Sequence, residues 1–101
     1  CPLAEVKMML EEIGHDVSYA YEDLVFAEHT AFIFQFDDKH PSNLKLFFNY
    51  EAQPDESKKI EQQLTIAAKK RKFNIINSGS FKLKQKEDSE EIDLLFFPTK
   101  K

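Results

Sequence analysis

The sequence is poor in glycine, the residue on which phosphate-binding loops depend. It contains only Gly14 and Gly79, far apart in the chain. A P-loop or a Rossmann turn needs several glycines within a few residues, because the backbone must approach the phosphates closely. The two isolated glycines therefore exclude nucleotide binding through either motif.

Cysteine and tryptophan are equally scarce. The one cysteine is Cys1 and there is no tryptophan, so no intrachain disulfide can form and no indole can stack on a sugar. A terminal thiol with no histidine fixed nearby is a poor nucleophile, and no serine lies in a Gly-x-Ser-x-Gly turn. We therefore expect a protein that is not an enzyme and uses no cofactor.

Metal ligands are also few. Asp37, Asp38 and His40 could hold a divalent cation if Glu28 or His29 approached them, but their spacing matches no familiar site. Asp, Pro, Ser and Asn between residues 37 and 43 are typical of a solvated turn. We interpret this segment as a turn and expect no metal, while a small ligand- or metal-binding domain remains the alternative.

Long apolar runs are missing too. No run approaches the roughly 18 residues that a membrane-spanning helix needs. Without such a segment we expect a cytoplasmic protein. A mature bacterial lipoprotein also begins with a cysteine, so the alternative is a domain anchored to the envelope by a lipid on Cys1. The sequence alone does not distinguish a processed lipoprotein start from a trimmed boundary at Cys1.

Basic residues are in the minority. Eighteen acidic against fourteen basic residues give a net charge of −4, which disfavours binding to the phosphate backbone of nucleic acids. The basic run Lys69–Lys72 is explained by its expected place in the last turn of a helix, where cations offset the helix dipole. We therefore expect a protein partner and no nucleic acid.

Apolar residues, by contrast, are plentiful: 42% of the 101 residues are hydrophobic and ten are phenylalanine. Helical spacing of apolar residues predicts one helix from about residue 3 to 13, capped by Gly14, and another over residues 54–72. The second helix should turn Leu64 inward and leave Ile66 on its solvent side. Alternation predicts strands at 32–36 and 44–50, which should form the central hairpin.

The last hairpin can be placed in register from its charges. If residues 87–90 form the loop, Lys84 faces Asp93 on one side while Phe81 meets Phe96 on the other. A turn is expected near residues 77–79. Residues 17–28 form either one bent strand or two, a choice that the pattern leaves open.

Together these elements predict one α+β domain over residues 1–101. Two helices should pack on a mainly antiparallel five- or six-stranded sheet, in the order α-β-β-β-α-β-β.

Several strands carry apolar residues on the face that should be polar. Ile33, Phe47, Leu95 and Phe97 are expected on the side opposite Phe34, Phe48, Leu94 and Phe96. Either a partner covers this face, or the first helix or the segment 19–26 folds across it. The exposed Ile66 favours a partner, so the predicted partner-binding residues are Ile33, Phe47, Ile66, Leu95 and Phe97.

The layout also resembles a known family. The segment 10–17 reads Leu-Glu-Glu-Ile-Gly-His-Asp-Val, an acidic turn follows, and Phe32-x-Phe34-x-Phe36-Asp37-Asp38 precedes Leu44-x-Leu46-Phe47-Phe48. This order of elements is similar to that of the YbjN family and the related type III secretion chaperone-like fold, although the final helix usual in secretion chaperones has no counterpart here. The resemblance implies a small, acidic, often dimeric protein-binding module without catalytic residues.

We therefore expect a non-enzymatic protein-interaction or regulatory module that binds a partner chain, or a second copy of itself, through an apolar sheet face.

Overall fold

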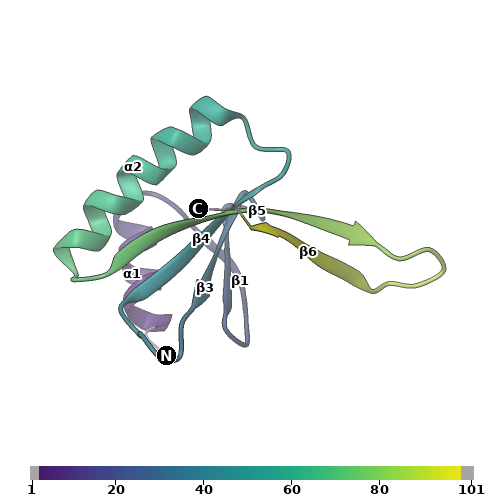
Figure 1. Ribbon diagram of the computed structural model, residues 1–101, viewed down its shortest axis with the longest axis horizontal. Helices are drawn as coiled ribbons and strands as arrows, with labels where there is room; N and C mark the ends of the chain where they lie inside the picture. The colour runs from purple at the N-terminus through teal and green to yellow at the C-terminus, as the bar shows by residue number, and fades with distance from the viewer. Residues whose placement is uncertain (1–2, 99–101) are drawn as a thin grey trace.

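A computed structural model describes residues 3–98. Cys1, on which the alternative of a lipid anchor depends, lies outside them. The elements follow the order α-β-β-β-β-α-β-β (Figure 1). Their bounds are α1 (Leu3–Glu12), β1 (Val17–Tyr21), β2 (Leu24–Ala27), β3 (Phe32–Phe36), β4 (Asn43–Asn49), α2 (Pro54–Lys70), β5 (Asn74–Gln85) and β6 (Ile92–Pro98). The α+β class is confirmed, and residues 17–28 form two strands, which makes the sheet six-stranded.

The strands lie in the sheet in their order along the chain, from β1 to β6. Neighbours pair antiparallel except β4 and β5, which are parallel. Parallel neighbours need a long crossover, and α2 supplies it between these two strands. The mainly antiparallel sheet and its central β3–β4 hairpin are confirmed, whereas the single parallel pair was not predicted.

Both helices cover the same face of the sheet (Figure 1). Helix α2 buries Leu64 as predicted, while Ile66 on its outer side remains 63% exposed. The helix side of the core consists of Val6, Met9, Leu10, Val25, Ala27, Phe32, Phe34, Phe36, Leu44, Leu46, Phe48, Leu64, Ala67 and Ala68. Each large apolar side chain buried in this way contributes about 1.5–3 kcal/mol. Neither helix in residues 3–98 is long and apolar enough to cross a membrane.

The two helices end in the same backbone geometry. Gly14 has φ +82°, its N–H donates to the Glu11 carbonyl at 3.1 Å, and the His15 N–H donates to the Leu10 carbonyl at 2.9 Å. This is a Schellman cap, which favours glycine at the left-handed position. Helix α2 ends likewise, but there Lys72 occupies the left-handed position with φ +64°. The cap predicted at Gly14 is confirmed.

Strand β5 is one continuous strand, so the turn predicted near residues 77–79 is wrong. The partners of Leu46 and Phe47 on β5 are Asn77 and Gly79, which leaves Ser78 as an extra residue in a β-bulge. Gly79 has φ +126°, a conformation that glycine adopts easily because it has no side chain and that other residues disfavour. The bulge turns the residues that follow it to the opposite face of the sheet.

The β5–β6 hairpin has the register that its charges predicted. Lys84 pairs with Asp93, and Phe81 pairs with Phe96. Pairing of β5 with β4 ends at Phe81, so residues 82–85 pair only with β6. The hairpin consequently projects beyond the other strands and lengthens the molecule to 45 Å (Figure 1).

The second face of the sheet is covered by the protein's own strands. Ile33 and Phe47 are buried there with Phe81, and Leu24, Phe26, Leu83, Leu94 and Phe96 pack against them. The sheet curls so that the rings of Phe26 and Phe81 meet edge-to-face at 6.4 Å. Of the two internal coverings suggested from the sequence, the first helix lies on the opposite face, whereas the segment 19–26 contributes Leu24 and Phe26 to this cluster.

The face assigned to β6 from the sequence was wrong. Ile33 and Phe47 share their side with Leu94 and Phe96, rather than with Leu95 and Phe97. The reason is the bulge at Ser78, because a one-residue slip exchanges the two faces of a strand and of every strand paired with it.

Candidate functional site

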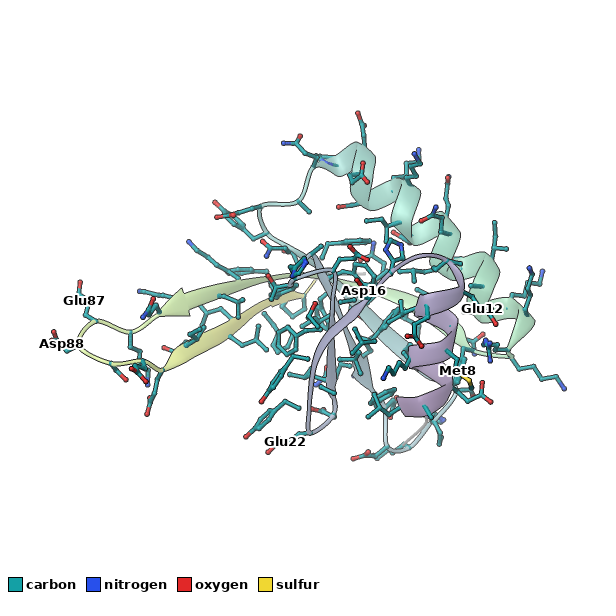
Figure 2. All side chains as sticks on the ribbon, turned by 180° about the vertical axis from the view of Figure 1, so that it is seen from behind. Met8, Glu12, Asp16, Glu22, Glu87 and Asp88 are labelled. Carbon is teal, nitrogen blue, oxygen red and sulfur yellow. The ribbon has the colours of Figure 1, made fainter. Side chains whose placement is uncertain are left out.

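An open apolar groove lies between the β1–β2 hairpin and the β5–β6 hairpin. It encloses about 640 Å³, within the range of known ligand pockets. Its lining consists of Tyr19, Tyr21, Leu24, Phe26, Thr30, Leu83, Glu90, Ile92 and Leu94. We call it the hairpin groove. Figure 2 marks the turns of the two hairpins, with Glu22 on one and Glu87 and Asp88 on the other.

Alternation along two strands creates the first wall of the groove. Tyr19 and Tyr21 are two residues apart on β1, so both point to the same side, where their rings stack at 6.3 Å. The ring of Phe26 from β2 lies 6.0 Å from that of Tyr19. The opposite wall comes from the cross-strand pair Leu83 and Leu94.

The strands that flank the groove are the two edges of the sheet. Within residues 3–98, β1 pairs only with β2 and β6 only with β5. Each therefore has a row of backbone N–H and C=O groups without a strand partner in this part of the chain. Such edges can accept an added strand from another polypeptide.

The rim of the groove is acidic. The β1–β2 turn carries Glu22 and Asp23, and the β5–β6 turn carries Glu87, Asp88 and Glu90. Asp23 accepts a hydrogen bond from Gln35 at 3.0 Å. Across the part of the chain that the structure describes, no ion pair involves Glu22, Glu87, Asp88 or Glu90.

The structure separates the five residues predicted to bind a partner. Ile33 is fully buried and Phe47 is only 5% exposed, so they offer almost no surface to a partner. Leu95 and Phe97 are exposed on the outer face of β6, and the Phe97 ring lies 6.4 Å from that of Tyr50. Ile66 lies on the solvent side of α2. Leu95 and Phe97 thus form a small outer patch with Tyr50, apart from the hairpin groove.

Sequence reasoning missed the groove itself. The alternation of Tyr19 and Tyr21 correctly indicated a strand, but the pattern of one strand does not show which other strand it will face. Only the curl of the sheet and the bulge at Ser78 bring this strand opposite Leu83 and Leu94. The one available signal was the pair of tyrosines two residues apart in a segment expected to be a strand.

The candidate metal residues Asp37, Asp38 and His40 lie in the turn between β3 and β4, as the sequence predicted. The carboxylate of Asp37 accepts the N–H groups of Lys39 at 3.0 Å and His40 at 3.4 Å. These hydrogen bonds, that from Lys39 above all, lower the pKa of Asp37. Glu28 and His29 lie in the β2–β3 turn, at the other end of β3. Among residues 3–98 no three His, Cys, Asp or Glu side chains are grouped to hold a metal ion.

The basic run at the end of α2 is partly used inside the molecule. The Arg71 guanidinium pairs with Glu5 at 2.9 Å and with Glu12, so it fastens α2 to α1. The bonds to Glu12 and Glu5 raise the pKa of Arg71. These two ion pairs account for the position of Arg71, so no phosphate ligand is needed to explain it.

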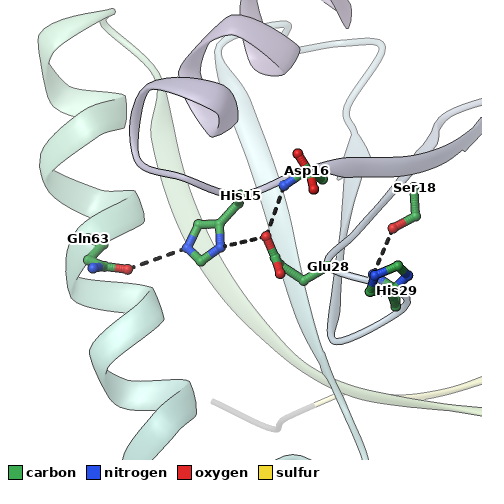
Figure 3. Close-up of polar contacts among 6 residues, drawn as sticks. All are labelled: His15, Asp16, Ser18, Glu28, His29 and Gln63. Carbon is green, nitrogen blue, oxygen red and sulfur yellow. Dashed lines mark hydrogen bonds and ion pairs between the residues drawn. The ribbon is translucent and has the colours of Figure 1, made fainter.

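A polar cluster behind the groove joins three segments (Figure 3). The Glu28 carboxylate accepts the Asp16 backbone N–H at 2.9 Å and lies 3.1 Å from His15 Nδ1. His15 Nε2 lies 3.4 Å from the Gln63 side-chain oxygen on α2. Hydrogen bonding by the Asp16 N–H, helped by His15, lowers the pKa of Glu28 although partial burial opposes the shift.

This cluster holds a turn with an unusual backbone. Glu28, His29 and Thr30 have φ values of +50°, +56° and +79°, which side chains normally disfavour by about 1–2 kcal/mol per residue. The Ser18 hydroxyl accepts the His29 N–H at 2.7 Å and ties the turn to β1. Because Thr30 lines the hairpin groove, the cluster fixes the position of one part of its wall.

Comparisons of the chain with protein-family models, with curated proteins and with solved structures gave no significant match. The resemblance to the YbjN and secretion chaperone-like proteins therefore stays a prediction.

Proposed function

We propose that this protein is a non-enzymatic interaction module that binds a segment of another polypeptide in the hairpin groove. The observation that carries the proposal is the groove's lining, in which exposed tyrosines and aliphatic side chains from two hairpins converge. Tyrosine and other large aromatic residues supply much of the binding energy at protein interfaces. Strands β1 and β6, which are the edges of the sheet within residues 3–98, add backbone groups that a polypeptide can pair with and a small molecule cannot match.

The chemistry of the lining supports binding rather than catalysis. Its polar groups are two phenols, the Thr30 hydroxyl and the Glu90 carboxylate, which come from different elements. A general base needs to lie within hydrogen-bond reach of the group that it activates. No hydrogen bond within the described chain joins any two of these groups. The suggested family resemblance implies the same, non-enzymatic class of function.

Selection from an unbiased peptide display library tests the proposal. We expect enriched peptides that bind the wild type and lose at least about tenfold in affinity for Tyr21→Glu, because the charge enters the apolar groove. The matched control is Phe97→Glu. Phe97 is 46% exposed, close to the 52% of Tyr21, and lies on an edge strand but on the outer face.

Two results would contradict the proposal. One is a failure to enrich any peptide on the wild-type protein. The other is a set of peptides that tolerate Tyr21→Glu but are lost with Phe97→Glu, which would move the binding site to the outer patch of Tyr50, Leu95 and Phe97.

A further inference from the structure

We infer that the hairpin groove selects a positively charged partner: an extended polypeptide segment whose apolar side chains are flanked by lysine or arginine. This inference rests on the proposed function and specifies the chemistry of the partner.

The first support is the sign of the charges around the groove. Glu90 is the one charged side chain in the lining, and Glu22 stands at the turn of the opposite hairpin. Glu87 and Asp88 lie at the tip of the projecting hairpin (Figure 2). Complementary charge at an interface rim steers association and rejects partners of the wrong sign.

The second support is the placement of the nearby cations. Lys82 and Lys84 alternate with Leu83, so they point to the outer face of β5, away from the groove. The Lys82 ammonium lies 5.1 Å from the centre of the Tyr50 ring. Lys86 is paired with Glu91 at 3.3 Å and Asp93 at 3.6 Å. Within the described chain, none of these three lysines forms an ion pair with the carboxylates around the groove, which can therefore pair with a basic partner.

The third support concerns the shape of the occupant. An extended chain presents side chains with a period of two, so alternate residues can enter the groove while its backbone pairs with an open edge such as β1. A lysine before or after the apolar stretch would then reach the acidic turns at the ends of the hairpins.

A second copy of this chain fits the groove poorly. In a two-fold dimer the same patch meets itself, so the acidic rim of one copy would face that of the other. Like charges placed together across an interface are unfavourable. The net charge of −4 adds to this repulsion. The inference therefore commits to a foreign basic segment.

Two synthetic peptides test the inference. Both contain the same alternating valine and phenylalanine residues; one is flanked by lysine pairs and the other by glutamate pairs. Titration into the ¹⁵N-labelled protein, followed by NMR, gives the dissociation constants and shows whether groove amides respond. We expect the lysine-flanked peptide to bind at least about tenfold more tightly at low salt. The difference should shrink at about 0.5 M salt, where exposed charges are screened.

Variants locate the effect. Glu90→Lys, and separately Glu22→Lys, should each weaken the preference for the lysine-flanked peptide. Glu11→Lys is the matched control, because it makes the same charge change on the exposed side of α1 and should leave the preference unaltered.

The outcomes distinguish a failure of the charge preference from a failure of peptide binding itself. Equal binding of both peptides, or a preference that Glu11→Lys reduces as much as Glu90→Lys, overturns the charge inference and leaves the binding module standing. Light scattering that shows a dimer for the wild type and a monomer for Tyr21→Glu overturns the foreign partner in favour of a second copy. If neither peptide moves any groove resonance, the charge inference is overturned, and the proposed function falls with it when the display library also enriches no peptide.

Discussion

At the scale of single residues, Glu28 shows how one carboxylate can organise a turn. Its oxygen receives the Asp16 N–H and lies beside His15, so it joins the end of α1 to the loop between β2 and β3. This loop contains three consecutive left-handed residues, and the contacts of Glu28 are part of what maintains them.

Removing the charge of Glu28 should make the protein less stable in a pH-dependent way. Its folded pKa is lowered from the ordinary value of 4.5, so its contribution is complete above about pH 4.5 and is lost as the pH falls through the lowered folded value. We expect Glu28→Gln to reduce the free energy of unfolding by about 1 kcal/mol at pH 7, and by less at pH 3.

Urea denaturation at pH 7, 5 and 3 measures this effect. Glu90→Gln is the control, since Glu90 is exposed and forms no ion pair in the described chain. A loss that stays constant over this pH range would show that Glu28 acts through packing instead of through its charge.

At the scale of elements, the two helix ends offer a natural comparison. Both use a left-handed residue to close the last turn, but α1 has Gly14 there and α2 has Lys72. A side chain in this conformation raises the energy of the folded backbone, and glycine does not.

Lys72→Gly should therefore stabilise the protein by about 0.5–1 kcal/mol. Lys59→Gly, at an exposed position in the interior of α2, should destabilise it by a similar amount because glycine is unfavourable within helices. Thermal unfolding monitored by circular dichroism compares the two. If Lys72→Gly lowers the melting temperature, the Lys72 side chain makes a contribution that outweighs its backbone strain.

The bulge in β5 has a larger effect, because it decides which residues enter the second side of the core. Deleting Ser78 would remove the extra residue and direct Phe81 away from Ile33 and Phe47. We expect a loss of at least about 3 kcal/mol, as for truncation of a buried phenylalanine. Deleting Ser89 in the exposed β5–β6 loop should cost much less, and equal losses in urea denaturation would contradict this role of the bulge.

The same bulge explains how far the sequence could predict this fold. Helix α2, the cap at Gly14 and the register of the last hairpin follow from local patterns, and all three are confirmed. The extra residue Ser78 was interpreted as part of a turn, since Asn, Ser and Gly are common in both settings. That one interpretation reversed the assignment of Leu95 and Phe97.

At the scale of the whole molecule, the two faces of the sheet differ in how completely they are covered. The helix side is sealed by α1 and α2. The other side is closed over Ile33 and Phe47 but opens into the hairpin groove toward the tips of the hairpins. The groove depends on elements distant in the chain, β1–β2 and β5–β6, so no local pattern could have predicted it.

The length of the projecting β5–β6 hairpin can change independently of the rest of the sheet. Beyond Phe81, β5 is free of β4, so the tip can gain or lose residues without disturbing the core strands. Adding or removing two residues from each strand preserves both the pairing and the side chains that face inward, whereas a one-residue change in one strand alone shifts the register. The hairpin can thus lengthen or shorten the binding surface in steps of two residues per strand while the rest of the architecture stays constant.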